Sequence, residues 1–423
     1  MSSSGFPLFL RWFTVSLIAG IVIAVAFVVI VDPYDQYRLV VLSGFNSVKP
    51  GLTRYRNEIK LVHAVEIRPD VLILGHSRAE VGLDPEAPVF GRHQLSAYNL
   101  AIAGSGIPTA RAQVEYLNRA GVKPKVIILG MEFLDFMESS SLTAPPAISH
   151  AKSINNSPSV DQWFWRFDSL FSLASIKDAI RTLYLQHHQE AETITPRGFN
   201  PLKEYGPIVR REGYFKLFRQ RAQESTRSYL KKARGSLSSA GFDNLHAILD
   251  MAAESGSDVG LIIYPYHAQI LALFEETGLT HAFEEWKNLL VREISAARLR
   301  HPHARISLFD FSGYGSYNCE KVPPKGDRVT ATHWYWEAGH FKKQLGDVIL
   351  ETIFSRSVNP ELIRHGGPGT SEQFGFELEE SNKNQNTQRI YLERLECMQN
   401  YPELFAEAAS LVADERRHRQ TAH

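Results

Sequence analysis

The stretch VLILGHSR, residues 71–78, joins four apolar residues to a glycine-led turn that carries a serine. A short apolar run that ends at a glycine is typical of a buried strand. A serine on the turn after such a strand can present its hydroxyl at the edge of a sheet, where a base can activate it. Serine is also common as the cap of a helix that follows a strand. The stretch therefore predicts a buried strand at 71–74, with Ser77 as either a nucleophile or a helix cap.

The same pattern, an apolar run followed by a turn, recurs along the chain. Further strands are predicted at 97–101, 126–129, 259–264 and 306–309. Stretches with helical periodicity alternate with them, at 109–120, 245–254, 281–298 and 336–354. Strands that alternate with helices are typical of a parallel sheet covered on both faces, so we expect a doubly wound α/β fold. Ligands of such sheets bind at the carboxyl ends of the strands.

Residues 12–31 contain no charged side chain and are almost wholly apolar. About 20 such residues span a hydrocarbon core, whereas the apolar core of a signal peptide has only ~7–15. We therefore expect residues 1–31 to be a short cytoplasmic stub and an uncleaved transmembrane anchor, with a cleaved signal or a buried core helix as alternatives. Four basic residues follow the run (Arg38, Lys49, Arg54 and Arg56), and only Arg11 precedes it. Because basic residues are in excess on the cytoplasmic side of a membrane, this count favours a cytoplasmic main domain. Long domains cross the membrane largely regardless of their charge, however, and the resemblance described at the end of this section favours an extracytoplasmic main domain.

The composition excludes some classes of protein. Lys+Arg and Asp+Glu both number 46, so the formal net charge is zero. A general nucleic-acid-binding protein normally carries a basic excess, and we expect no nucleic acid as a partner. Cys319 and Cys397 match no metal-binding spacing, so we predict no metal site. Whether these two cysteines pair or stay as thiols is left open.

The main domain is predicted to run from residue 32 to residue 354. Its strand–helix pattern breaks at about 136–241, which we interpret as a helical insertion over the top of the sheet that shapes access to the site. The alternative is an insertion with no role in the site. Residues 355–423 are predicted to be a polar linker, with its glycines at 366–369, and a final helix at 389–412.

Glu337 and His340 lie three residues apart at the start of the predicted helix 336–354. On a helix, residues at this spacing share one face. A carboxylate there can hold an imidazole in one tautomer and stabilise the imidazolium that forms when the imidazole acts as a base. Three other residues compete for these roles: His333 and His267 as the base, and Asp310 as the acid.

Candidate oxyanion donors follow two other predicted strands. Gly104 lies in a glycine-containing loop after the strand 97–101, where a backbone N–H can approach a substrate closely. The side-chain amide of Asn99 can add a second donor. Glu132 follows the strand 126–129 and is expected either to hydrogen-bond into the site or to be solvated. For Asn99 and Gly104 the alternative is an ordinary turn.

The blocks around Ser77, Asn99 with Gly104, Glu132, and Glu337 with His340 occur in the order seen in the SGNH hydrolase superfamily, the GDSL-like esterases and acetyltransferases. The resemblance covers about residues 66–136 and 258–354. It implies a flavodoxin-like three-layer sandwich with a catalytic triad of Ser77, His340 and Glu337. The backbone N–H groups of Ser77 and of a residue near Gly104 would form the oxyanion hole. No cofactor is implied.

This chain departs from the family pattern at three positions. His76 stands where the family usually has aspartate, and Glu337 replaces the aspartate of the last block. Glu132 lies nearest to the place of an asparagine that donates to the oxyanion, and an ionised carboxylate cannot donate a hydrogen bond.

The resemblance is closest to the membrane-anchored branch associated with bacterial cell-surface polysaccharides. It implies an inner-membrane protein with a periplasmic domain, which acts as an esterase or O-acyltransferase on an acylated polysaccharide or another acylated envelope substrate. A membrane acyl-transfer protein is a possible partner. The alternative is a non-catalytic carbohydrate-binding or scaffold protein, in which aromatic residues such as Trp334 and Trp336 stack on sugar rings.

Overall fold

The structure is a computed structural model that describes residues 5–51, 54–138, 158–188, 190–356 and 374–421, and side chains in the third range from Trp165 onward. The chain divides into two compact units. The anchor unit comprises residues 1–59 and 153–195, and the sheet unit comprises residues 60–152 and 196–423. The predicted insertion at 136–241 is therefore not one subdomain, because its middle part belongs with the N-terminal segment and its last part with the sheet.

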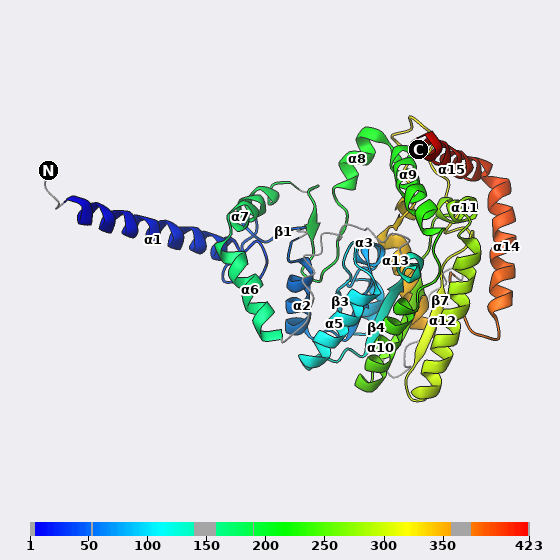
Figure 1. Cartoon of the computed structure of the whole chain (residues 1–423), viewed down its shortest axis with the longest axis horizontal. Helices are drawn as coiled ribbons and strands as arrows, with labels where there is room; N and C mark the ends of the chain where they lie inside the picture. Colours follow the sequence, from blue (N-terminus) through cyan, green and yellow to red (C-terminus); the bar gives the residue numbers. More distant parts are fainter. Residues whose placement is uncertain (1–4, 52–53, 139–157, 189, 357–373, 422–423) are drawn as a thin grey trace. The chain divides into compact units, whose positions relative to one another are not determined.

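A six-stranded sheet forms the centre of the described part of the sheet unit (Figure 1). Its strands, in spatial order, are β10 (Phe376–Glu377), β7 (Ile306–Asp310), β6 (Asp258–Ile263), β4 (Val126–Met131), β2 (Val71–Leu74) and β3 (Ala97–Asn99). The strands from β7 to β3 are parallel, and β10 pairs with β7 in the antiparallel direction. The mostly parallel α/β sheet predicted from the sequence is confirmed, with one additional edge strand from the C-terminal region.

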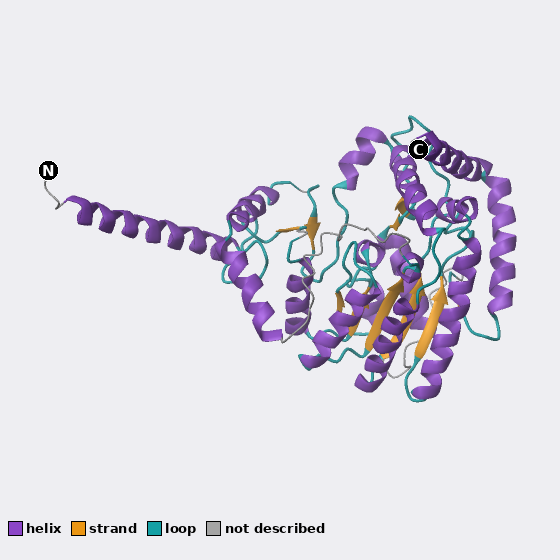
Figure 2. Cartoon of the chain, in the orientation of Figure 1, coloured by secondary structure: helices purple, strands orange, loops and turns teal. Residues whose placement is uncertain are grey.

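The apolar runs form strands because helices bury them. All side chains of β2, β4 and β7 are buried, which is typical of parallel strands. The helices of this unit are α2 (Arg56–Ile67, which starts in the anchor unit), α3 (Ser77–Gly82), α4 (Pro88–Arg92), α5 (Ile107–Arg119), η1 (Phe133–Phe136), α8 (Tyr205–Glu212), α9 (Tyr214–Lys232), α10 (Ser239–Ser255), α11 (Ala268–Thr277), α12 (Thr280–Arg300), α13 (Lys343–Arg356), α14 (Lys383–Asn400) and α15 (Pro402–Thr421) (Figure 2). Helix α10 packs against α5 and α12, and α13 packs against α3 and α4.

The C-terminal region is more structured than predicted. The expected helix 389–412 is two helices, α14 and α15, which separate at Pro402 because proline disfavours helical geometry in the residue before it. Helix α15 packs against α9 and α11. A disulfide joins Cys397 of α14 to Cys319, which follows β7, so the two cysteines are paired. The predicted glycine linker at 366–369 lies outside the described residues.

The anchor unit starts with a 27-residue helix, α1 (Gly5–Val31). It contains one stretch, Phe6–Val31, that is long and apolar enough to cross a membrane or to act as a signal sequence. Helices α6 (Pro158–Phe171) and α7 (Leu173–Leu185) pack against it. The short strands β1 (Lys49–Pro50) and β5 (Thr193–Ile194) form an antiparallel pair beside α7.

Candidate active site

The turn after β2 places Ser77 at the first position of α3. Gly75 has a φ of +140°, and a Cβ on it would lie 2.4 Å from the hydroxyl oxygen of Tyr264, so the turn requires glycine. The cap of α3 is His76, whose Nδ1 accepts the backbone N–H of Arg78 at 3.2 Å. Of the two roles left open for Ser77, the cap is thus filled by its neighbour, and the serine hydroxyl is left for another partner.

That partner is His340. Its Nε2 lies 2.8 Å from Oγ of Ser77, and its Nδ1 makes a close hydrogen bond with Oε1 of Glu337. The second carboxylate oxygen of Glu337 accepts the backbone N–H of Gly339 at 2.6 Å. Ser77 and His340 are partly exposed, whereas the side chain of Glu337 is only 2% exposed. The three side chains therefore form a chain of hydrogen bonds from a buried carboxylate to an accessible hydroxyl.

The element that carries Glu337 and His340 was predicted wrongly. The two residues lie on a hairpin rather than on the expected helix: Glu337 ends β8 (Tyr335–Glu337) and His340 begins β9 (His340–Phe341). Ala338 and Gly339 form the turn between them. The tight turn brings the two side chains together as a helical turn would, so the predicted pairing occurs on a different backbone.

The charge of Glu337 is stabilised from two sides. Burial alone would raise its pKa, but the hydrogen-bonded imidazole of His340 and the guanidinium of Arg221 lower the pKa to about 2. Nε of Arg221 lies 3.1 Å from Oε2 of the carboxylate, and Arg221 comes from α9 in the last part of the predicted insertion. Glu337 is thus ionised at neutral pH and suited to orient His340.

A second polar network lies behind the serine and holds the hairpin in place. Glu132 accepts hydrogen bonds from His76 at 2.9 Å and from the Tyr266 hydroxyl at 3.2 Å, and it forms a close ion pair with Arg78. Arg78 also donates from Nε to the carbonyl of Gly339 at 2.7 Å. Glu132 is buried, so neither solvation nor a role as an oxyanion donor applies to it. Glu132 instead holds Arg78 in position, and Arg78 in turn binds the hairpin through the carbonyl of Gly339.

The same network determines the state of His76. Because Nδ1 accepts a backbone N–H, the proton of the neutral ring is on Nε2, which donates to Glu132. Burial and the nearby Arg78 lower the pKa of His76 to about 3. The residue that replaces the usual aspartate therefore acts as a neutral helix cap and as a hydrogen-bond donor to Glu132.

Asn99 is not an oxyanion donor. It is fully buried, and its Nδ2 donates to the carbonyls of Ala79 and Leu83, each at 2.8 Å. Its Oδ1 accepts the N–H of Ala101 at 3.0 Å. Both amide protons are used to fasten β3 to α3, so the prediction of a second donor at Asn99 is wrong.

Gly104 remains a candidate donor. It is exposed, has a φ of +74°, and its backbone N–H has no hydrogen-bond acceptor among the described residues. Its loop is held beside the turn of Ser77 by two bonds: Ile102 N–H to the carbonyl of Gly75 at 3.0 Å, and Ala103 N–H to Glu80 at 3.2 Å. The first N–H groups of a helix have no acceptor within it, so Ser77 can supply a second backbone donor.

The three competing residues have other partners. His267 is buried and caps α11, and Asp310 forms an ion pair with Lys287 at 3.0 Å. His333 is exposed, with its ring against that of Trp334. Within the described residues, His340 is the histidine that contacts Ser77.

Sequence reasoning missed the two arginines of the site. Arg78 directly follows the serine, and a cation next to a proposed nucleophile could have drawn attention. Arg221 lies within the predicted helical insertion at 136–241, and no local signal distinguishes it from the other basic residues there.

A cavity of about 370 Å³ lies beside the loop of Gly104. Its lining is mixed, with apolar groups from Ile107, Pro108, Met137 and Ala240 and polar groups from Asp135, Glu138, Ser238 and Asn244.

The arrangement holds the parts that serine acyl chemistry needs. Among the described residues no cluster of histidine, cysteine or acidic side chains could hold a metal ion. Comparison of the chain with protein-family models, curated proteins and solved structures finds no significant match.

Proposed function

We propose that the sheet unit is a serine acyl esterase or O-acyltransferase with an SGNH-like three-layer fold. The observation that carries the proposal is the chain of hydrogen bonds from Glu337 through His340 to Oγ of Ser77. A serine hydroxyl is a poor nucleophile until a base removes its proton, and this chain supplies the base and the group that orients it.

The reaction would proceed in two steps. Nε2 of His340 takes the proton of Ser77 as Oγ attacks the ester carbonyl, and the N–H groups of Ser77 and Gly104 stabilise the oxyanion. His340 then gives the proton to the leaving alcohol, and an acyl-serine remains. In the second step His340 deprotonates water or a sugar hydroxyl, which takes the acyl group and restores Ser77.

The resemblance noted above leads us to infer the substrate and the location. We infer an acylated cell-surface or exported polysaccharide as the substrate, and a membrane acyl-transfer protein as a partner. Asp135, Glu138 and Asn244 in the mixed lining of the cavity offer hydrogen-bond partners to the hydroxyl groups of such a substrate. We further infer that α1 anchors the protein in the bacterial inner membrane and that the sheet unit faces the periplasm.

A non-catalytic polysaccharide-binding protein is the second candidate. It is favoured by the loss of side-chain oxyanion donors, since Asn99 and Glu132 are both occupied elsewhere. The half-exposed Trp334 and Trp336 already pack against Tyr317 and Tyr205, which leaves less of their faces for sugar rings.

A serine-directed fluorophosphonate probe separates the two candidates. The full-length protein in detergent should be labelled and should hydrolyse an activated acetyl ester, and Ser77→Ala and His340→Ala should abolish both. Ser105→Ala is the matched control, because Ser105 lies in the Gly104 loop and its hydroxyl donates only to the carbonyl of Ile102. A folded wild-type protein that neither reacts with the probe nor turns over the ester would contradict the enzyme and favour the binding protein.

A further inference from the structure

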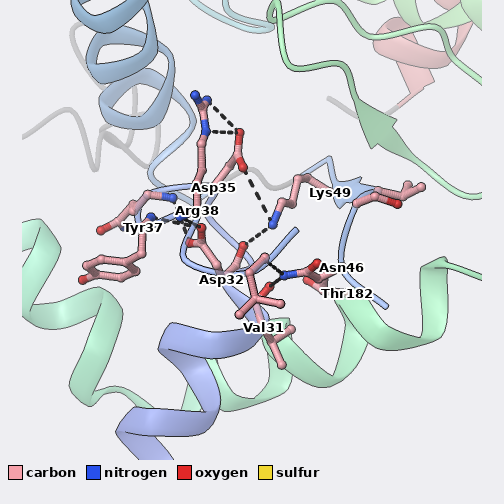
Figure 3. A network of polar contacts seen from close by, with 12 residues as sticks. Val31, Asp32, Asp35, Tyr37, Arg38, Asn46, Lys49 and Thr182 are labelled. Carbon is pink, nitrogen blue, oxygen red and sulfur yellow. Dashed lines mark hydrogen bonds and ion pairs between the residues drawn. The ribbon is translucent and has the colours of Figure 1, made fainter. Parts of the chain in front are cut away.

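The end of α1 is built into the anchor unit rather than joined to it by a free linker (Figure 3). Asp32 follows the helix with a φ of 51°, the left-handed conformation that commonly ends helices. Nδ2 of Asn46 donates to the carbonyls of Ile30 and Val31, each at 3.2 Å, and Nζ of Lys49 donates to the carbonyl of Asp32 at 2.8 Å. The last two carbonyls of the helix and the carbonyl of Asp32 are therefore bound by side chains that follow in the chain, from Asn46 in the loop and Lys49 at the start of β1.

Apolar packing reinforces this join. Val28 and Val31 are buried against Ala179 of α7, and Leu170 of α6 packs on the same cluster. The carboxylate of Asp32 accepts three backbone N–H groups of the next turn, those of Gln36, Tyr37 and Arg38. Because the helix end is fixed on both sides, the direction of α1 determines how the anchor unit meets a membrane.

The exposed length of α1 matches a bilayer. From Phe6 to Ile23 every residue of the helix is exposed, and from Ala24 onward the anchor unit begins to cover it. These 18 residues rise about 27 Å at 1.5 Å per residue, and their number is within the range of about 17–25 residues that spans a hydrocarbon core of ~30 Å. With α1 in a membrane, the parts of the unit that contact its last turn lie at the level of the lipid headgroups.

Those parts carry an apolar surface, which we call the juxtamembrane patch. Its members are exposed large apolar side chains from the loop after α1 and from the corner between α6 and α7: Leu39, Val41, Leu42, Phe167, Phe171 and Leu173. The loop lies at the helix end, because the side-chain amide of Asn46 that caps α1 also bonds the backbone of Val40 and Leu42. The corner lies there too, because Leu170 packs against the cluster that contains Val28 and Val31.

We propose that the juxtamembrane patch inserts into the interfacial region of the bilayer, so that the anchor unit is seated on lipid. Exposed apolar side chains favour burial at the headgroup boundary. Two exposed cations flank the patch, Arg166 next to Phe167 and Lys177 one turn after Leu173, where they can meet lipid phosphates. The proposal rests on α1 crossing the membrane and does not depend on the esterase.

Fluorescence quenching in vesicles tests this seat. Because the two native cysteines form a disulfide, a thiol-reactive fluorophore labels only an introduced cysteine. Full-length Leu42→Cys and Leu173→Cys are labelled with an environment-sensitive dye and reconstituted into phosphatidylcholine vesicles with nitroxide-bearing acyl chains. Ile18→Cys reports the span, and His187→Cys, exposed just beyond the far end of α7, is the control. Circular dichroism checks the folding of each variant.

We expect the dyes at positions 42 and 173 to lose intensity as the dye at 18 does, while the dye at 187 keeps its intensity. Quenching at 18 without quenching at 42 and 173 would overturn the proposal and indicate that a partner protein, absent from the vesicles, covers the patch. Equal quenching at 187 would also overturn it, because the whole unit would then be immersed. No quenching at 18 would show that α1 does not enter the bilayer. It would contradict both the transmembrane anchor and the insertion of the juxtamembrane patch.

Discussion

Two places along the carboxyl edge of the six-stranded sheet each lie beside a buried carboxylate, and the two carboxylates have different roles. The first place follows β2, and we call it the open end. There Glu337 of the β8–β9 hairpin pairs with His340, which reaches the accessible Ser77. The second place is the end of β7, and we call it the sealed end. There Asp310, the last residue of the strand, is fully buried and pairs with Lys287 of α12 at 3.0 Å. In both places positive partners lower the pKa of the carboxylate although burial opposes ionisation.

The sealed end is closed by the C-terminal region. Asn386 of α14 donates to Asp310 at 2.7 Å, and Ser312 donates to it at 2.5 Å. The disulfide between Cys319 and Cys397 ties the same helix to the chain that follows β7. A buried carboxylate with a shifted pKa is therefore no mark of a functional site by itself. The difference is access, since the partner of Glu337 reaches a solvent-facing hydroxyl and the partners of Asp310 are enclosed.

The largest expected effect breaks the open end alone. In Glu337→Gln the side chain can place an amide N–H opposite Nδ1 of His340, which favours the tautomer that cannot accept the proton of Ser77. We expect kcat/KM per folded molecule for an activated ester to fall by about 10³–10⁴-fold, and the free energy of unfolding to fall as well because the ion pair with Arg221 is lost. Ester hydrolysis and chemical denaturation on the same preparation measure the two quantities.

Asp310→Asn is the matched control at the sealed end. It also replaces a buried carboxylate by its amide, and it leaves the residues around Ser77 unchanged. We expect kcat/KM per folded molecule to stay as in the wild type while stability falls. Equal losses of activity in the two variants would mean that the ends are not functionally distinct.

The next effect concerns stability at the sealed end. Lys287→Met removes the main cation beside Asp310 and leaves a buried charge with neutral hydrogen-bond partners. We expect the free energy of unfolding to fall by about 3–5 kcal/mol. Urea denaturation monitored by circular dichroism measures this loss.

A double substitution tests whether Lys287 and Asp310 stabilise the fold as a pair. When Asp310→Asn accompanies Lys287→Met, no uncompensated charge is buried, so the pair should lose less than the sum of the two single losses. Simple additivity would show that Lys287 and Asp310 act independently, and the comparison with the open end would lose its basis.

The comparison also shows how far the sequence could predict the molecule. The parallel strands were predictable, because runs such as 71–74 and 126–129 are buried on both faces and so lack polar alternation. The partnership of Ser77, His340 and Glu337 was implied by the family resemblance, whereas residue type and the three-residue spacing alone left other histidines and another acid as competitors. The supporting backbone was not, although the aromatic residues at 334–336 favour a strand over a helix.

Other features depend on contacts between distant segments. Asn99 was assigned as a donor because its amide is chemically suitable, yet only the fold shows that Ala79 and Leu83 take both of its protons. The seal over Asp310 comes from Asn386, 76 residues further along the chain. No local pattern encodes either pairing.

The smallest expected effect, taken per residue and per pH unit, is a pH dependence of stability. Burial lowers the pKa of His76, beside the open end, to about 3, helped by Arg78. Burial also lowers the pKa of His267 to about 4. His267 follows β6, which lies next to the sealed β7. Below pH 6.5 the unfolded chain binds a proton at each histidine that the folded chain does not bind. Stability should therefore fall with falling pH, by up to about 1.4 kcal/mol per pH unit for each residue.

His267→Asn isolates one of these contributions. Asparagine can still cap α11, as Nδ1 of His267 does when it accepts the N–H of Gln269 at 3.2 Å, but it binds no proton. The slope of unfolding free energy against pH should therefore become shallower between pH 6.5 and 4.5. Below that range Glu337, with its pKa of about 2, also costs stability as pH falls, because its carboxylate stays ionised while an unfolded glutamate binds a proton. Denaturation curves at pH 7, 6 and 5 give the slope, and an unchanged slope would mean that His267 is already protonated in the folded protein. Of these two histidines, which both cap helices, only His76, beside Ser77, would then be neutral in the folded protein. A neutral histidine cap would thus distinguish the open end from the end of β6.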